Sequence, residues 1–201
     1  MTPALVVSMA ALGFTVASFW FLWAYRGKVV GHPVGSYSAG FGSGDFRLRL
    51  PVVLANTGAR TRVVVDARIR IVSGPKESTL KWQTTRRSLK PMSDDVEDFA
   101  AAFTLGNRGA ERHFMEFVGP LADGVPKPQD YEYCLDVRLD RDLAWHMASR
   151  DVLRFGHLVH PDRYITYANS AEACSEDEVA SARQALLAYA RKSGISTTWG
   201  D

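Results

Sequence analysis

The first charged residue of the chain is Arg26, and the residues before it are almost all apolar. Residues 4–25 contain nothing more polar than Ser8, Thr15 and Ser18. As an α-helix with a rise of about 1.5 Å per residue, this segment would span roughly 33 Å, which exceeds the ~30 Å hydrocarbon core of a bilayer. The pattern predicts a transmembrane helix that contacts membrane lipids through residues 4–25.

A buried helix of a soluble domain and a cleaved signal peptide are the alternatives for this segment. A signal peptide needs a basic start and small residues at its cleavage site. This chain begins Met-Thr-Pro, and its apolar segment ends in bulky aromatic residues. Because aromatic residues are enriched at membrane interfaces, we expect the interface to be formed by Trp20, Trp23, Tyr25, Arg26 and Lys28.

Positive charge flanks one end of the apolar segment. No Lys or Arg precedes it, whereas Arg26 and Lys28 follow it directly. Because cytoplasmic flanks are enriched in Lys and Arg, this predicts a single-pass protein of the cell membrane, with its N-terminus outside and residues 26–201 in the cytoplasm. Cys134 and Cys174 fit a reducing compartment as free thiols, while a disulfide between them would favour the outside.

Alternating apolar and polar residues predict β-strands in the middle of the chain. The longest apolar face consists of Val63, Val65, Ala67, Ile69 and Ile71. Further alternating or apolar segments are residues 46–50, 80–84, 99–105, 112–118 and 131–139. Short strands separated by Gly, Pro and Asn turns are typical of an antiparallel two-layer sandwich, with its first two strands paired as a hairpin. Residues 141–170 fit closing strands or, in part, a helix.

Glycine content and charge divide the chain into four segments. Residues 31–44 are rich in glycine and contain a proline, as is typical of a flexible spacer. Near the C-terminus, Ser175 and Glu178 have capping-box spacing and Gly194 follows a basic turn, which predicts an amphipathic helix. The predicted domains are a transmembrane anchor with a basic flank at residues 1–28, a Gly-rich linker at 29–45, a β-sandwich at 46–170 and a C-terminal helix and tail at 171–201.

The order of these elements resembles a known group of proteins. The stretch RLRLPVVLANTGARTRVVVDARIRI is followed by a strand with Trp82 and by the runs FAAAFTL and MEFVG. Over residues 46–168 this layout is similar to small single-pass bacterial membrane proteins with an immunoglobulin-like β-sandwich and no assigned activity. With this resemblance, the predicted fold is mainly β: an N-terminal transmembrane helix, an antiparallel immunoglobulin-like β-sandwich and a C-terminal amphipathic α-helix. No functional residues follow from the resemblance.

Basic residues are concentrated in the first half of the predicted sandwich. Residues 45–90 contain 11 Lys and Arg against 3 Asp and Glu, whereas residues 91–162 contain 7 against 14. Because alternate residues of a strand share a face, four arginines fall opposite the longest apolar face, and two more lie on the partner strand. This predicted arginine face, a candidate binding surface, consists of Arg47, Arg49, Arg60, Arg62, Arg68 and Arg70.

The predicted arginine face has three candidate partners. The first is the acidic strand with Glu132, Asp136 and Asp140, where each ion pair would contribute about 0.2–1 kcal/mol. The second is the anionic membrane surface, where each cation contributes ~1 kcal/mol. The third is nucleic acid, which is not expected, because no aromatic residues are interleaved with the arginines to stack on bases.

Two motifs near residue 160 suggest specific chemistry. His157, His160 and Asp162 resemble a metal cluster, but no cysteine pair supports it, and we predict no metal site. His160, Pro161 and Asp162 also match the tripeptide of J-domain co-chaperones. That family needs helices on both sides of the tripeptide, whereas residues 131–140 alternate as a strand.

The sequence contains no GxSxG, HExxH or P-loop motif, so we expect no enzymatic activity and no cofactor. The expected function is a membrane-tethered, non-enzymatic interaction or scaffolding module that binds an unknown protein partner or the adjacent membrane surface. One alternative is a membrane-anchored J-domain-like co-chaperone that acts through the His-Pro-Asp tripeptide. The other is a hydrolase or ligand-binding domain, which would need a pocket that gathers residues distant in sequence.

Overall fold

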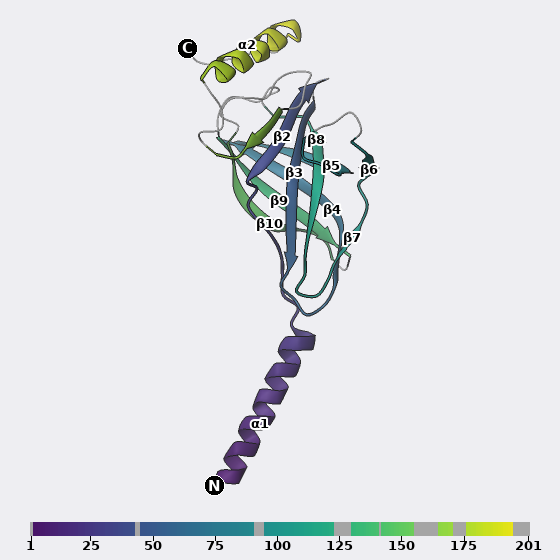
Figure 1. The fold of residues 1–201 in the computed structure, drawn as a ribbon, viewed down its shortest axis with the longest axis vertical. Helices are drawn as coiled ribbons and strands as arrows, with labels where there is room; N and C mark the ends of the chain where they lie inside the picture. Colours follow the sequence, from purple (N-terminus) through teal and green to yellow (C-terminus); the bar gives the residue numbers. More distant parts are fainter. Residues whose placement is uncertain are drawn as a thin grey trace.

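An N-terminal helix projects from one end of a β-domain in the computed structural model of this chain, and a C-terminal helix lies at the opposite end (Figure 1). The structure describes residues 2–42, 45–90, 95–122, 130–140, 142–154, 165–170 and 176–194. In chain order the elements are α1 (Pro3–Phe19), η1 (Trp20–Ala24), β1 (Val29–Gly31), β2 (Ser36–Gly42), β3 (Asp45–Asn56), β4 (Arg62–Ser73), β5 (Lys76–Arg86), β6 (Glu97–Phe99), β7 (Phe103–Leu105), β8 (Ala110–Gly119), β9 (Asp130–Leu139), β10 (Asp142–Arg154), β11 (Ile165–Ala168) and α2 (Glu176–Lys192).

The N-terminal apolar helix has the predicted length and polarity. α1 continues into the π-helical turn η1, so Pro3–Ala24 forms a 22-residue apolar helix that is long enough to cross a membrane. No described residue of α1 is buried. The hydroxyls of Ser8 and Thr15 donate to backbone carbonyls four residues earlier, at 2.9 and 2.8 Å. Neither hydroxyl therefore needs water inside a bilayer.

The described strands form one antiparallel sheet in the order β10-β9-β4-β5-β8-β3-β2-β11, with β1 on β3, β6 on β5 and β7 on β4. Side chains join the two ends of this sheet. The Tyr37 hydroxyl of β2 donates to the Arg154 carbonyl of β10 at 2.7 Å. The amide of Asn169 donates to the carbonyls of Val34 and Val152 at 3.0 and 2.9 Å. The sheet thus curls into a barrel-like body, whose opposite walls correspond to the layers of the predicted sandwich.

The hydrophobic core lies between these walls. On β9 the five predicted apolar positions are all buried: Tyr131, Tyr133, Leu135, Val137 and Leu139. The predicted polar face is not fully exposed, since Cys134 and Asp136 are buried as well. Trp82 of β5 is buried too, and its indole N–H donates to the Thr84 carbonyl at 3.0 Å. Trp82 is therefore part of the hydrophobic core, with its N–H satisfied.

The segment predicted as a flexible linker, residues 29–45, is part of the sheet. It contains β1 and β2, which both pair with β3. Tyr37, Ala39 and Phe41 of β2 are buried at alternate positions. The prediction of a spacer was wrong because these apolar residues follow the two-residue period of a strand within the glycine-rich stretch.

The predicted hairpin between the first two strands of the sandwich is also wrong, since β8 and β5 lie between β3 and β4 in the sheet. The run at residues 99–105 is divided between β6 and β7, which pair with β5 and β4. A bulge between Val64 and Asp66 changes the predicted parity of β4. Val64 is buried as a result, whereas Val63 and Val65 are not.

Within residues 141–170, which the sequence left open between strand and helix, the described residues form β10, which pairs with β9, and β11, which pairs with β2. A J-domain needs helices in this part of the chain, so the J-domain-like alternative is wrong. Its tripeptide His160, Pro161 and Asp162 lies outside the described residues, as does His157.

The predicted C-terminal helix is confirmed as α2. Its residues Leu186 and Ala190 are buried, and the Tyr189 ring meets the Phe41 ring of β2 edge-on, with centroids 5.2 Å apart. Ser175 of the predicted capping box lies outside the described residues. The helix therefore packs on the end of the β-domain that is far from α1 (Figure 1).

Candidate membrane-facing basic site

The segment that follows the apolar helix is hydrogen-bonded to the β-domain. The backbone N–H of Ala59 donates to the Tyr25 carbonyl at 2.7 Å, and that of Thr57 donates to the Lys28 carbonyl at 2.9 Å. The Thr57 hydroxyl accepts the Lys28 N–H at 2.8 Å. The helix is thus joined to the loop between β3 and β4 by a bonded junction, not by a flexible spacer.

Two glycines and one buried amide make this junction possible. Gly27 has a φ of +56° and lies against the backbone of Gly58, so a Cβ on either residue would overlap the opposite backbone. Asn56, whose residue is 2% exposed, accepts the Gly58 N–H at 2.9 Å. Its amide nitrogen donates to the carbonyls of Arg60 and Gly106 at 2.8 and 2.9 Å. Asn56 therefore ties two loops to each other beneath the helix.

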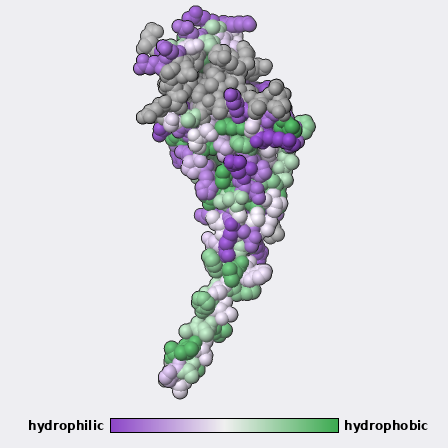
Figure 2. Space-filling view, viewed as in Figure 1, coloured by the Kyte–Doolittle hydropathy of each residue, from purple (hydrophilic) through white to green (hydrophobic). Residues whose placement is uncertain are grey.

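Five cationic side chains surround the junction, and we call them the basic collar: Arg26, Lys28, Arg60, Arg62 and Arg108. Arg62 Nη2 lies 3.5 Å from the Arg26 carbonyl, to which it donates. Arg108 donates to the carbonyl of Phe21 in the last helical turn, and its guanidinium lies 4.3 Å from the Phe21 ring centroid. A cation is favourable here because the C-terminal carbonyls of a helix carry partial negative charge. Hydrophilic side chains gather at this neck in Figure 2.

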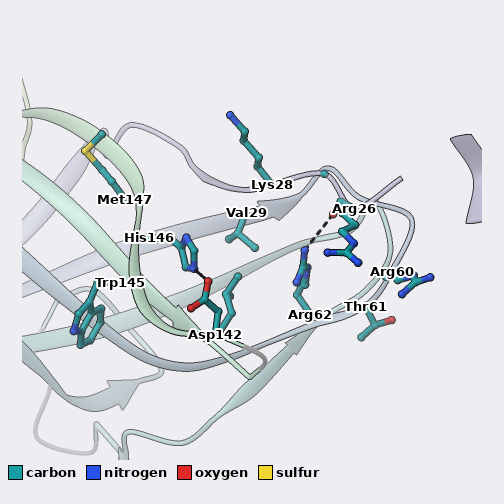
Figure 3. Close-up of a pocket in the computed structure, with 12 residues that line it drawn as sticks. Arg26, Lys28, Val29, Arg60, Thr61, Arg62, Asp142, Trp145, His146 and Met147 are labelled. Atoms are coloured by element: carbon teal, nitrogen blue, oxygen red, sulfur yellow. Dashed lines mark hydrogen bonds and ion pairs between the residues drawn. The ribbon is translucent and has the colours of Figure 1, made fainter. Parts of the chain in front are cut away.

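A pocket of about 660 Å³ opens beside the basic collar (Figure 3). Arg26, Arg60 and Arg62 lie at one end of it, and Trp145 and Met147 of β10 lie at the other. The lining residues are Arg26, Gly27, Lys28, Val29, Arg60, Thr61, Arg62, Leu139, Asp142, Trp145, His146 and Met147.

Asp142 is the one carboxylate among these described lining residues. Its Oδ1 accepts the Ala144 N–H at 3.0 Å, and its Oδ2 lies 2.9 Å from His146 Nε2. The hydrogen bond from Ala144, with a smaller contribution from His146, lowers the pKa of Asp142. Asp142 is therefore ionised at neutral pH and has a partner in His146, so the cations of the lining are in excess.

Arg68 and Arg70 of the predicted arginine face are paired with Asp136 of β9. The Nε atoms of Arg68 and Arg70 donate to Asp136 Oδ2 at 2.9 and 2.6 Å. Although burial of this carboxyl group opposes its ionisation, the hydrogen bonds from Arg70 and Arg68 hold the pKa of Asp136 below its usual value. This confirms the alternative in which these arginines pair with the acidic strand.

The two arginines of β3 lie elsewhere. Arg49 is buried, where it contacts Glu116 at 3.0 Å and Asp95 at 2.6 Å. Arg47 is exposed near the start of β3, at the end far from α1. The six arginines therefore do not form one face, because β3 and β4 are not neighbours, and two of the six belong to the basic collar.

The predicted interface aromatics lie next to the basic collar. Trp20 and Trp23 are exposed on η1. The Tyr25 ring centroid lies 5.5 Å from that of Trp20 and 5.9 Å from that of Phe21. Aromatic rings followed by basic side chains are the order found at the ends of membrane-spanning helices.

The structure tests the predictions on free thiols and metal sites at the described residues. Cys134 of β9 is a buried free thiol, and burial raises its pKa. Cys174 lies outside the described residues. Among the described residues, no group of three or more His, Cys, Asp or Glu side chains is placed to hold a metal ion.

Comparison with known proteins returned no family model, no curated protein and no solved structure that matches this chain. The resemblance to small single-pass membrane proteins with an immunoglobulin-like sandwich stays a prediction.

Sequence reasoning missed Asn56, Arg108 and the pocket as parts of the site. The Asn-Thr-Gly sequence at residues 56–58 signals a tight turn, but it does not show that the turn contacts the end of the helix. Arg108 stands in the turn between β7 and β8, about 80 residues from the helix in sequence. Its place in the collar depends on long-range strand pairing, which no local pattern encodes.

Proposed function

We propose that the protein is a single-pass, membrane-tethered, non-enzymatic interaction module whose β-domain rests on the membrane and binds anionic lipid headgroups through the basic collar. The observation that carries this proposal is the position of the collar, whose side chains lie around the end of the apolar helix. Binding of a protein partner stays a prediction.

The bonded junction keeps the basic collar close to the bilayer. Arg26 comes two residues after Ala24, so its backbone lies within about 7 Å of the end of the helix. Thr57 and Ala59 bind the same segment, which brings Arg60 to a similar depth. Attraction to anionic lipids falls off within a Debye length of about 8–10 Å. The collar therefore lies where the surface potential acts.

The same charges support the proposed orientation of the chain. The cytoplasmic leaflet carries anionic lipids, and each nearby Lys or Arg is worth about 1 kcal/mol. A collar with five cations would gain most from that leaflet. We therefore place the β-domain in the cytoplasm and the N-terminus outside the cell membrane.

Charge reversal within the collar tests the proposal. The full chain is reconstituted in bilayers, and electron spin resonance measures how strongly it associates with spin-labelled phosphatidylserine relative to phosphatidylcholine. In the double variant Arg60→Glu and Arg62→Glu, the preference for phosphatidylserine over phosphatidylcholine should fall at least about fivefold, since each cation contributes ~1 kcal/mol.

The matched control is the double variant Arg47→Glu and Lys81→Glu, which makes the same change in net charge at two exposed positions that flank Val118 of β8, away from the collar. This control should keep the preference for phosphatidylserine. Equal loss in both double variants would show a general charge effect, and no loss in either would remove the collar from the proposed function.

A further inference from the structure

The pocket beside the basic collar has a volume and a variety of lining side chains that simple attraction to a charged surface does not require. We propose that it receives the headgroup of an anionic lipid that carries a phosphomonoester, and so several negative charges, in preference to a singly charged headgroup. This inference rests on the proposed function, for which it names the class of ligand.

Charge is the first argument. The pocket is lined by Arg26, Lys28, Arg60 and Arg62 against the single carboxylate Asp142, which already has His146 beside it. A phosphodiester carries one negative charge, whereas a phosphomonoester carries about −1.5 to −2 at pH 7. One arginine guanidinium group can donate two parallel hydrogen bonds to two oxygens of the same phosphate. Three arginines and a lysine therefore match a headgroup with several charges better than one with a single charge.

Shape is the second argument. A volume of about 660 Å³ is in the range of sites for small organic ligands and exceeds what one phosphate group fills. Away from the arginines the wall includes Trp145 and Met147, with the Asp142 and His146 pair between the two ends (Figure 3). The Arg68 guanidinium already lies 4.3 Å from the Trp145 ring centroid, so Met147 is the side chain that offers apolar contact to the face of a ring. Asp142 and His146 offer hydrogen-bond partners for the hydroxyl groups of that ring.

Position is the third argument, and it favours a lipid over a soluble ligand. Residues 26–29 form one side of the pocket and directly follow the apolar helix, which ends at Ala24. The pocket therefore opens at the level of the headgroups when the helix spans the bilayer. A lipid whose acyl chains lie along α1 would reach the pocket with its headgroup alone.

Competition in bilayers tests the inference on the full chain. The chain is reconstituted with spin-labelled phosphatidylserine, which is then displaced either by phosphatidylinositol 4-phosphate or by unlabelled phosphatidylserine, at equal total lipid charge. Phosphatidylinositol 4-phosphate is the probe because it carries a phosphomonoester on a hydroxylated ring. We expect it to displace the label at least about fivefold more effectively per unit charge, because several collar cations bind one headgroup at once.

A variant that fills the pocket without changing charge separates this inference from the proposed function. Met147 is 57% exposed at the pocket wall, so Met147→Trp should fold, block the pocket and abolish the preference for the phosphomonoester. Val152→Trp is the matched control, on the same strand about 16 Å away. This control should retain the preference. Both variants should still favour phosphatidylserine over phosphatidylcholine, because the collar is intact.

Three outcomes would overturn the inference. The first is that the probe displaces the label no better than phosphatidylserine at equal charge, and the second is that Met147→Trp keeps the full preference. Either result would mean that attraction to the charged surface explains the binding without the pocket. If inorganic phosphate or soluble inositol 4-phosphate competes as well as the lipid, the ligand is a soluble phosphate compound. None of these results contradicts the proposed function, which is tested separately by the reversal of Arg60 and Arg62 against its matched control.

Discussion

Asn56 satisfies three backbone groups of two loops from a buried position at the end of β3. In Asn56→Ala these groups lose their partner while they remain shielded from water, which should lower the free energy of unfolding by about 2–4 kcal/mol. Thermal unfolding of the detergent-solubilised chain measures the loss. Asn107 is exposed in a neighbouring turn, so Asn107→Ala is the control and should unfold like the wild type. Equal stability of both variants would show that Asn56 does not organise the junction.

Asp136 gives the molecule a specific dependence on pH. Its side chain is 3% exposed and is held by Arg68 and Arg70, so its pKa is lower in the folded chain than in the unfolded chain. A lowered folded pKa contributes stability above the unfolded value of about 3.9, and that contribution is lost as the pH falls through the folded pKa. Asp136→Asn should therefore lower the free energy of unfolding by roughly 2–4 kcal/mol at pH 7.

The difference between Asp136→Asn and the wild type should narrow as the pH falls below about 4. Urea unfolding at pH 7, 4 and 3 measures this difference. Asp98→Asn removes an exposed carboxylate of β6 and should follow the wild type at each pH. A difference that stays constant from pH 7 to pH 3 would contradict the role of the Asp136 charge.

At the scale of single elements, the junction between α1 and β3 can be tested with two glycines of nearly equal φ. Gly27 and Gly74 have φ values of +56° and +58°, but only the Cβ added at Gly27 would meet backbone, that of Gly58. Both alanine variants carry the same conformational strain. A difference between their rates of hydrogen exchange therefore reports the close contact of Gly27 with Gly58. Gly27→Ala should speed hydrogen exchange of the Thr57 and Ala59 amides at least about tenfold, since it opens the junction locally.

Gly74→Ala should leave the exchange of those two amides unchanged. Its turn lies between β4 and β5, and nothing lies within 4 Å of the added Cβ. If both variants leave the junction amides protected, the two backbones do not need the close approach of Gly27 and Gly58. Faster exchange in both variants would instead indicate a general loss of stability.

Strands were predictable from sequence where burial follows the two-residue period without interruption, as at residues 80–84 of β5. The prediction failed where glycine content masked that period, as in β2, and where a bulge changed it, as at Val64 in β4. Pairing was not predictable because β3 and β4 are consecutive in sequence but separated by β8 and β5 in the sheet. Neighbours in a sheet depend on long-range contacts that a local pattern does not contain.

The same reason limited the prediction of the candidate site. Arg26 and Lys28 could be recognised because they flank the apolar segment directly. Arg60 and Arg62 were identified from strand parity, yet they lie at the base of the domain, where the loop before β4 contacts the end of the helix. The pocket needed β10 beside residues 26–29, and these segments are about 110 residues apart in sequence.

At the scale of the whole molecule, the bonded junction means that the domain cannot move away from the bilayer while the helix stays inserted, unless the junction opens. The collar then keeps the β3–β4 loop in the headgroup region when the lipids are anionic. Hydrogen exchange of residues 57–62 should therefore be several-fold slower in nanodiscs with phosphatidylserine than in nanodiscs of phosphatidylcholine alone. The turn at Gly74, at the far end of the domain, serves as the internal control and should exchange equally in both.

Salt separates the contribution of the collar from that of the apolar helix. At 1 M salt the Debye length falls to about 3 Å, so the protection of residues 57–62 by anionic lipids should disappear. Exchange within α1 should stay slow at every salt concentration, because hydrocarbon protects its backbone and screening does not reach it. If residues 57–62 exchange at the same rate in both lipids, the domain stands clear of the surface and the helix alone holds it to the membrane. If their protection survives 1 M salt, apolar contacts rather than the collar hold the domain down.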